Sequence, residues 1–324
     1  MNHEFSMGEI QVAEPGTGGG SGDSDEVPLY YTNGSDPTYS IVCTERYTPP
    51  CSGKNGLFAN VPIPNGAYAS SDNDHHASVI VGSTKQIYEY DFWEFNCYAK
   101  PSHSIRKRSD SSGKCRGTTY PVSGGGTVYV SYGSACDATS FANGGACRGS
   151  ANAAGVPEQP GLLDPRELIA GAIQHVLYVA VGCPNGKYIW PAHISDGYPK
   201  NCKVQGGPAE GERIWLDLTD AQIDQLGDPT WATAILHAMH DYGLFIVATA
   251  GDFNQPWGFD ALDSATFTYM GETDPWASFF DGIGCQAPSN PCGYAENASH
   301  LQIPLTGVSQ SDIHIVCPNC RKKT

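Results

Sequence analysis

Basic residues are scarce in this 324-residue chain: 18 Lys and Arg stand against 34 Asp and Glu, which gives a formal net charge of −16. An acidic chain repels phosphate backbones, so we expect no nucleic-acid partner. No apolar run approaches the roughly 18 residues that a transmembrane helix needs, so we expect no membrane span. The G-x-S-x-G, P-loop and H-E-x-x-H motifs are also absent, so serine hydrolase, nucleotide and zincin chemistry have no support. We therefore expect no cofactor and no bound metal ion.

The start of the chain lacks the apolar core of a signal peptide. Residues 1–27 are polar and rich in glycine, which is typical of a disordered leader. Beyond about residue 60 no segment has the composition of a linker between domains. We therefore predict a disordered leader over residues 1–27 and a single domain over residues 28–324.

Cysteine, in contrast, is abundant, with 12 residues. An even count at short spacings is typical of disulfides formed in an oxidising compartment, so we expect a secreted or extracellular protein. Zinc is the alternative, but only Cys317 and Cys320 have the spacing of metal ligands. The sequons at Asn33 and Asn297 fit export. Spacing does not fix the connectivity, and the simplest pairing joins neighbours: Cys43/Cys51, Cys97/Cys115, Cys136/Cys147, Cys183/Cys202, Cys285/Cys292 and Cys317/Cys320.

Glycine (38) and proline (23) are frequent, and strand-like runs outnumber helical ones. The runs at 75–83 and 85–95 predict a β-hairpin, and five further strands are expected at 126–133, 171–181, 187–192, 212–218 and 244–250. Asp164 and Pro165 predict a helix start with Glu167 as capping-box partner, and a second helix is expected between Pro229 and Gly243. The pattern predicts a mainly β fold: a jelly-roll-like β-sandwich with two or three short helices and disulfide-tied loops.

Several motifs together resemble a family of secreted bacterial proteins. They are "DNDHHASVIV…IYEY", "GLLDPRELIAGAIQHVLYVAV…YIWPAH" and "ILHAMHDYGLFIVATAG", and the resemblance runs from about Pro62 to Gly251. The family is similar to polysaccharide-active β-sandwich proteins in size, export and organisation, which implies a glycan partner. The chain departs from the family pattern at residues 163–165 and between Cys97 and Ala151.

Histidines supply the first candidate site. His175 alternates with Ile173, Leu177 and Val179 in an expected strand, which places an imidazole on a largely apolar face. It is interpreted either as a buried structural histidine or as a catalytic group of a cleft, with the structural role favoured. Asp74 and His76 fall on one face at the start of another expected strand, and His193 follows Trp190. If these strands are neighbours, the three imidazoles and the carboxylate could converge in a metal site or an acid/base site.

His237 and His240 form a separate pair on the second expected helix. They lie three residues apart, so they share one helix face, and Asp241 lies beside them. We interpret this group as a solvated helix face near a C-terminus, where cations are favoured.

Carboxylates supply the second candidate site. Glu89 and Asp91 alternate with Tyr88 and Tyr90, so one strand face is acidic and the other is aromatic. An i, i+2 pair on one face lies about 7 Å apart, within the roughly 5–10 Å that glycosidases use. The alternative is a solvent-facing strand side. Trp93 shares the acidic face and could stack on a sugar ring.

Two functional hypotheses follow. The first is a secreted enzyme acting on a polysaccharide in a cleft on one sheet. It is either a hydrolase that uses Glu89 and Asp91, or a lyase that uses His76 and His175 with Tyr88 or Tyr90. The second is a non-catalytic cell-surface, structural or carbohydrate-binding protein stiffened by disulfides. The candidate catalytic residues are Asp74, His76, Glu89, Asp91 and His175, and the candidate substrate-binding residues are Tyr88, Tyr90, Trp93, Trp190 and His193.

Overall fold

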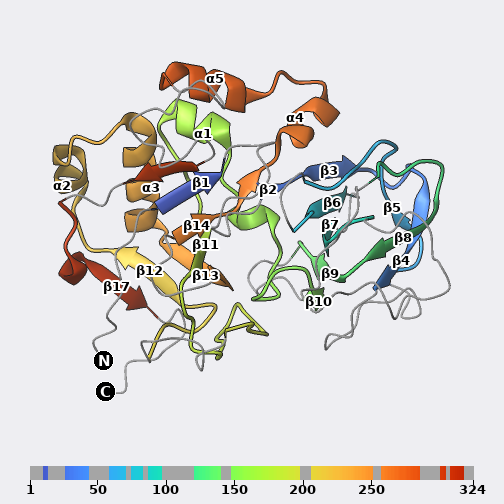
Figure 1. Cartoon of the computed structure of the whole chain (residues 1–324), viewed down its shortest axis with the longest axis horizontal. Helices are drawn as coiled ribbons and strands as arrows, with labels where there is room; N and C mark the ends of the chain where they lie inside the picture. Colours follow the sequence, from blue (N-terminus) through green and yellow to red (C-terminus); the bar gives the residue numbers. More distant parts are fainter. Residues whose placement is uncertain are drawn as a thin grey trace. The chain divides into compact units, whose positions relative to one another are not determined.

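The computed structural model describes residues 10–13, 26–43, 58–70, 74–82, 87–96, 120–139, 147–197, 206–250, 257–284, 300–303 and 307–316. These residues show a mixed α/β fold with more strand than helix and several open sheets (Figure 1). Two compact units contain them. Unit 1 comprises Met1–Asp25, Pro160–Leu262 and Asp274–Thr324, and unit 2 comprises Glu26–Gln159 and Asp263–Thr273. The single sandwich domain over residues 28–324 stays a prediction.

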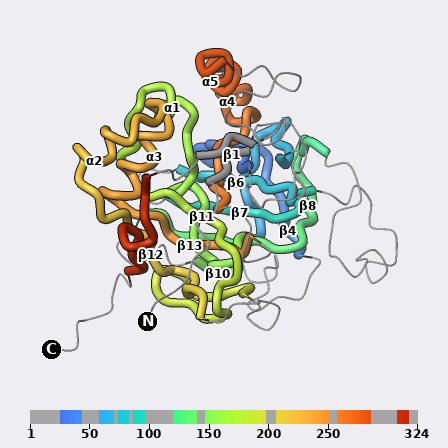
Figure 2. The backbone as a smooth tube through the Cα atoms, turned by 60° about the vertical axis from the view of Figure 1, so that its left-hand side comes forward, coloured from blue at the N-terminus to red at the C-terminus, as the bar shows by residue number. Residues whose placement is uncertain are grey.

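Unit 2 contains two open sheets with the strand orders β10-β9-β7-β6-β3 and β5-β4-β8. The pairs β3–β6 and β4–β8 are parallel, and the other pairs in these two sheets are antiparallel. Its elements are β2 (Glu26–Val27), β3 (Leu29–Thr32), β4 (Thr38–Cys43), β5 (Val61–Pro62), β6 (Ala77–Gly82), β7 (Ile87–Trp93), β8 (Gly126–Val130), β9 (Tyr132–Asp137), β10 (Cys147–Ser150) and α4 (Ser264–Met270). The expected hairpin is confirmed as β6 and β7, which run side by side in Figure 2.

The core of unit 2 takes apolar side chains from both sheets. Val79 and Phe92 of the five-stranded sheet and Ile41 and Val128 of the three-stranded sheet belong to one buried cluster. Successive side chains of a strand point to opposite faces, so the residues that alternate with Val79 and Phe92 lie on the other face of the five-stranded sheet. That other face carries Ser78 of β6, Asp91 of β7 and Ser134 of β9.

Unit 1 is built on a seven-stranded sheet with the order β16-β1-β14-β11-β13-β12-β17. Helix α3 packs against β12, α2 and α1, and α1 also packs against α5 (Figure 1). Its elements are β1 (Ile10–Ala13), α1 (Pro165–Ala170), β11 (Leu177–Val181), β12 (Arg213–Leu216), α2 (Asp220–Gln225), α3 (Thr230–Asp241), β13 (Leu244–Thr249), β14 (Trp257–Phe259), β15 (Ala261–Leu262), α5 (Pro275–Gly282), β16 (His300–Ile303), η6 (Gln310–Asp312) and β17 (Ile313–Val316). A further 3₁₀ turn, η4, spans Gln159–Gly161.

The apolar pattern of α3 is confirmed. Trp231, Ile235 and Met239 are buried on one face, as their spacing predicts. The helix ends before Gly243, which has a φ of +78°. A Cβ atom added there would lie 2.5 Å from Cγ of Arg213, so both the backbone conformation and the packing favour glycine.

Other expected elements differ from the structure. The strand expected over residues 171–181 begins only at Leu177, and the segment 187–192 contains an isolated bridge at Tyr188 in place of a strand. The described residues hold five α-helices rather than two or three. The additional ones are α2, α4 and α5, and their starts carry short-range caps: a Thr219–Gln222 capping box and N-cap aspartates at 263 and 274.

The disulfide between Cys136 and Cys147 is present, as neighbour pairing predicts. It joins β9 to the adjacent strand β10, whose register places the two residues directly opposite each other. Of the six expected pairs, this one is confirmed.

The other five expected cysteine pairs stay predictions. Cys43 and Cys183 are disulfide-bonded, but their expected partners, Cys51 and Cys202, lie outside the described residues. The structure therefore does not test whether neighbour pairing holds for these two bonds. Both members of the remaining three pairs also lie outside the described residues: Cys97 and Cys115, Cys285 and Cys292, and Cys317 and Cys320.

The segment expected to be a disordered leader contains β1, which pairs with β14 and β16. At its end, Glu26 and Val27 form β2 and are buried. Residues 1–9 and 14–25 lie outside the described part of the chain. Among the described residues, none of the helices has the length and hydropathy that a membrane crossing would require.

Candidate functional site

One face of the five-stranded sheet in unit 2 gathers polar side chains from three strands. Asp91 of β7 lies opposite Ser78 of β6 and Ser134 of β9, and Trp93 lies opposite Tyr132. Residues directly opposite each other in antiparallel strands share a face, so the strand register itself brings these side chains together. The acidic face of β7 predicted from its alternation is therefore confirmed.

This face is buried around the carboxyl groups. Glu89 and Asp91 are both 0% exposed, so the alternative of a solvent-facing strand side is wrong. The hydroxyl of Ser78 donates to one oxygen of Asp91 at 2.7 Å, and the hydroxyl of Ser134 donates to the other at 2.9 Å. The backbone N–H of Gln159 donates to Oε1 of Glu89 at 2.6 Å. A buried carboxylate without such donors would be strongly destabilising.

The two carboxyl groups differ in how they hold a proton. Burial raises the pKa of Glu89 well above its usual value, and the neighbouring Asp91 raises it further. Burial also raises the pKa of Asp91, but the hydrogen bonds from Ser78 and Ser134 oppose that shift, as does a hydrogen bond shared with Glu89. Two buried carboxyl groups this close share one proton, because a second charge would be uncompensated. We infer that Glu89 carries the proton and that Asp91 is the anion.

His76 lies close enough to this pair for its charge to lower the pKa of Asp91, and it is buried. The expected strand face shared by Asp74 and His76 is wrong, because His75 between them has a left-handed φ of +52° and β6 begins only at Ala77. Side chains alternate regularly only where the backbone is extended. Asp74 instead precedes the strand, and its carbonyl accepts a hydrogen bond from the N–H of Glu94 at 2.9 Å.

The aromatic residues of β7 divide between the two faces. Tyr90 lies in the apolar core opposite the carboxyl groups, and burial raises its pKa. Tyr88 packs against it with a ring separation of 6.2 Å. Trp93 instead shares the acidic face and stacks on Tyr132, with ring centroids 4.8 Å apart and planes 11° apart. Only Trp93, among these three, lies on the same side as the carboxyl pair.

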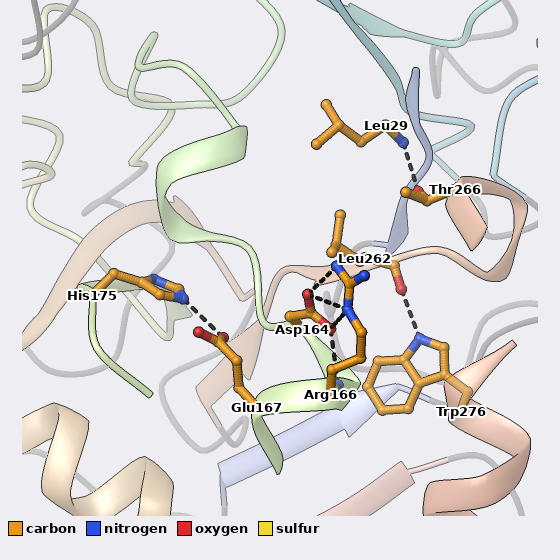
Figure 3. A network of polar contacts seen from close by, with 8 residues as sticks. All are labelled: Leu29, Asp164, Arg166, Glu167, His175, Leu262, Thr266 and Trp276. Atoms are coloured by element: carbon orange, nitrogen blue, oxygen red, sulfur yellow. Dashed lines mark hydrogen bonds and ion pairs between the residues drawn. The ribbon is translucent and has the colours of Figure 1, made fainter. Parts of the chain in front are cut away.

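His175 lies in the loop between α1 and β11, and not in the strand that its apolar neighbours suggested. Its Nδ1 lies 2.7 Å from the carbonyl oxygen of Val176, which can only accept a hydrogen bond. Its Nε2 lies 2.9 Å from Oε2 of Glu167 (Figure 3). The side chain is still 32% exposed, so His175 is less buried than an apolar strand face would make it.

The contacts of His175 favour its charged form. The hydrogen bond to Glu167 raises the pKa of His175, and desolvation only partly offsets this. Glu167 therefore bonds His175 and does not complete a capping box. The helix start is capped by Asp164, whose side chain accepts from the N–H of Arg166 at 2.8 Å and also forms an ion pair with that arginine (Figure 3). The bond between Glu167 and His175 is therefore a structural link from α1 to the loop that precedes β11.

A loop of unit 1 presents two exposed aromatic side chains. Tyr188 is 54% exposed and Trp190 is 44% exposed. The N–H of Ile189 donates to the carbonyl of Glu210 at 2.9 Å, and Tyr188 pairs with Glu210 in a parallel bridge. The bridge covers Tyr188 alone, and Trp190 lies in the turn that follows it, before the cis peptide bond to Pro191. His193, three residues after Trp190, is partly exposed in the same loop.

Sequence reasoning missed a second carboxyl pair below this loop. Glu210 is 0% exposed, and its pKa is raised to about 10, first by burial and next by the charge of Asp196. Asp196 is partly exposed and accepts a hydrogen bond from the hydroxyl of Thr249 at 2.6 Å. No local pattern joins positions 196 and 210, because only the folded chain brings Asp196 and Glu210 together.

The chain matches no protein-family model, no curated protein and no solved structure.

Proposed function

We propose that the protein is a secreted, non-catalytic protein that binds a glycan through Tyr188 and Trp190. The observation that carries the proposal is the exposure of these two aromatic side chains, two residues apart in one loop. Flat aromatic rings offer sugars an apolar surface at low entropic cost, and their polar tips remain available for hydrogen bonds. The partly exposed Asp196 and His193 supply polar groups nearby that can accept or donate hydrogen bonds to hydroxyls.

The backbone around these rings supports a preorganised surface. Two backbone hydrogen bonds of Glu210 hold the segment on either side of Tyr188. The carbonyl of Glu210 accepts from the N–H of Ile189, and the N–H of Glu210 donates to the carbonyl of Lys187 at 3.1 Å. A Cβ atom added to Gly211 would lie 2.0 Å from the carbonyl oxygen of Ile189, so the loop packs closely on the segment just before β12. A binding surface that is already ordered loses less entropy when a ligand binds.

The secreted location and the glycan partner rest on the cysteine pattern and on the resemblance to secreted bacterial proteins. The disulfides at Cys43, Cys136, Cys147 and Cys183 agree with an oxidising compartment. We also retain as part of this proposal the jelly-roll-like sandwich, of which the two sheets of unit 2 around one apolar core would be a part.

The experiment is a binding assay with insoluble polysaccharides such as cellulose, chitin and xylan. We expect the wild type to be depleted from solution by at least one of them, and Trp190→Ala to remain in solution. Tyr120→Ala is the matched control, because Tyr120 is also an exposed aromatic residue, at 46%, but belongs to unit 2. Equal depletion of all three proteins would contradict the proposed surface.

Hydrolysis of a glycan is the second candidate function, and the Glu89–Asp91 pair favours it. A general acid must hold a proton at neutral pH beside an ionised partner, and the raised pKa of Glu89 next to Asp91 meets this condition. The stacked Trp93 and Tyr132 flank the pair on the same face. We rank it second because both carboxyl groups are 0% exposed and Asp91 already accepts two hydroxyl hydrogen bonds. Release of reducing sugar that Glu89→Gln abolishes would reverse this order.

A further inference from the structure

Two helices of unit 1 place three potential metal ligands side by side. Asp220, His240 and Asp241 each offer one ligand atom, and these atoms lie within 4.8 Å of one another. Asp220 is the first residue of α2, directly after its N-cap, and His240 and Asp241 are the last two residues of α3. From the sequence alone, His240 and Asp241 read as a solvated helix face. Asp220 joins them only because α2 packs against α3.

The imidazole of His240 is oriented by groups outside this cluster. Its Nδ1 lies 3.0 Å from the carbonyl oxygen of Leu216. A carbonyl can only accept, so Nδ1 carries the hydrogen, and in the neutral ring Nε2 keeps its lone pair. The ring also stacks on Trp215, with centroids 6.0 Å apart and planes 26° apart. Histidines that bind metals are usually held in this way, through a hydrogen bond from the other ring nitrogen to a carbonyl or a carboxylate.

The charges around His240 also favour a cation. Asp220 and Asp241 are exposed carboxylates beside a partly exposed histidine. His237 lies beside this cluster and contacts one of its carboxylates: Nδ1 of His237 lies 3.3 Å from Oδ1 of Asp220, and Nε2 lies 3.1 Å from Oδ1 of Asp224. The net charge of −16 raises the local concentration of cations near the whole chain.

We propose that Asp220, His240 and Asp241 bind a Zn²⁺ ion, with water in the remaining position. One imidazole nitrogen and two carboxylate oxygens form a donor set that Zn²⁺ accepts, and three protein ligands plus water is a common arrangement at accessible zinc sites. Calcium and magnesium prefer oxygen ligands alone, so the histidine selects against them. The bound ion joins the first turn of α2 to the last turn of α3. The proposal does not depend on glycan binding.

Calorimetric titration of the full-length protein with ZnCl₂ tests this site. We expect wild-type protein to bind Zn²⁺, and Asp241→Asn and His240→Gln each to weaken the affinity at least tenfold. Asp224→Asn is the matched control. This change also removes one negative charge from the surface of these helices, but Asp224 contacts His237 and is not one of the three proposed ligands. We expect its affinity to stay within twofold of the wild type. Titration with CoCl₂ provides a second readout, because the visible absorption of bound Co²⁺ reports the coordination geometry directly.

Three results would overturn the proposal. The first is a wild-type protein that binds no Zn²⁺, and the second is binding that survives unchanged in both Asp241→Asn and His240→Gln. The third is an equal loss in Asp224→Asn and Asp241→Asn, which would show a general effect of charge and no specific site. Asp241 is exposed at a helix end, so its substitution leaves the fold intact, and circular dichroism verifies this for each variant.

Discussion

Tyr188 pairs with Glu210 through an isolated parallel β-bridge, so a side chain that is 54% exposed is adjacent to one that is completely buried. The bridge links the proposed glycan-binding surface to a protonated acid beneath it. The two parts can therefore be tested separately. Substitutions of Tyr188 and Trp190 test the proposed glycan-binding surface, and substitution of Glu210 tests the buried acid.

The raised pKa of Glu210 makes stability depend on pH. Its folded-state pKa of about 10 lies far above the ordinary value of 4.5, so the folded state binds a proton that the unfolded state releases. The contribution of this proton is fully present below pH 4.5 and is lost as the pH rises toward 10. We expect the stability of Glu210→Gln relative to the wild type to increase as the pH rises from 5 to 9, by up to about 1.4 kcal/mol per pH unit, because the amide needs no proton.

Urea unfolding at several pH values between 5 and 9 measures this effect. Glu272→Gln, at an exposed position, serves as the control and should follow the wild type. If the stability difference between wild type and Glu210→Gln does not change with pH, Glu210 is not the group that holds the proton.

The Glu89–Asp91 pair should respond asymmetrically to amide substitution. Glu89→Gln replaces a protonated acid with a neutral group of the same shape, so we expect a loss of less than about 1 kcal/mol at pH 7. Asp91→Asn places an amide donor against a hydroxyl that now donates to Asp91, so we expect a loss of about 1–3 kcal/mol. Chemical denaturation of both variants distinguishes the two sites. A larger loss for Glu89→Gln would mean that the charges are assigned the wrong way round.

The His175–Glu167 contact should be structural. We expect His175→Gln to lower stability by about 0.5–1.5 kcal/mol, the usual range for one hydrogen bond, and to leave glycan binding unchanged. Because the pKa of His175 is raised, its contribution is complete below pH 6.5 and declines as the pH rises through the folded-state pKa. Glu167→Gln should cost a similar amount, and the double variant should cost less than the sum of both. Full additivity in this cycle would show that the two side chains do not interact in solution.

Removal of the Cys136–Cys147 disulfide should destabilise unit 2. The bond closes a short loop, with a sequence separation of 11, and we expect the double variant Cys136→Ser/Cys147→Ser to lose about 2–4 kcal/mol. Thermal unfolding with and without reductant measures this loss.

Mass analysis before and after reduction tests the wider expectation that at least five bridges are present. Mostly free thiols would remove the argument for export.

Local patterns predicted the local structure well. The β6–β7 hairpin, the apolar face of α3 and the Cys136–Cys147 pairing all follow from residues close together in the sequence. His175 was misplaced because its apolar neighbours resemble a strand, whereas its bonds to Glu167 and Val176 hold it in a loop. The burial of Glu89 and Asp91 also could not be predicted, since an alternating strand does not reveal what covers each face.

Long-range relationships account for most of what the sequence did not reveal. Asp196 and Glu210 interact from separate segments of the chain, and Asp220 meets His240 through helix packing. The spacing of these residues matches no motif, because two separate segments supply each group. The starts of α2, α4 and α5 were missed signals that lay within reach, in the Thr219–Gln222 capping box and the N-cap aspartates at 263 and 274.

The most direct test of glycan binding by the exposed aromatic pair is the retardation of the native protein in gels that contain a soluble form of the retained polysaccharide. We expect Tyr188→Ala and Trp190→Ala each to raise the dissociation constant at least tenfold, a loss of about 1.4 kcal/mol or more, while Tyr120→Ala migrates like the wild type. If both loop variants bind as tightly as the wild type, Tyr188 and Trp190 do not form the glycan-binding surface.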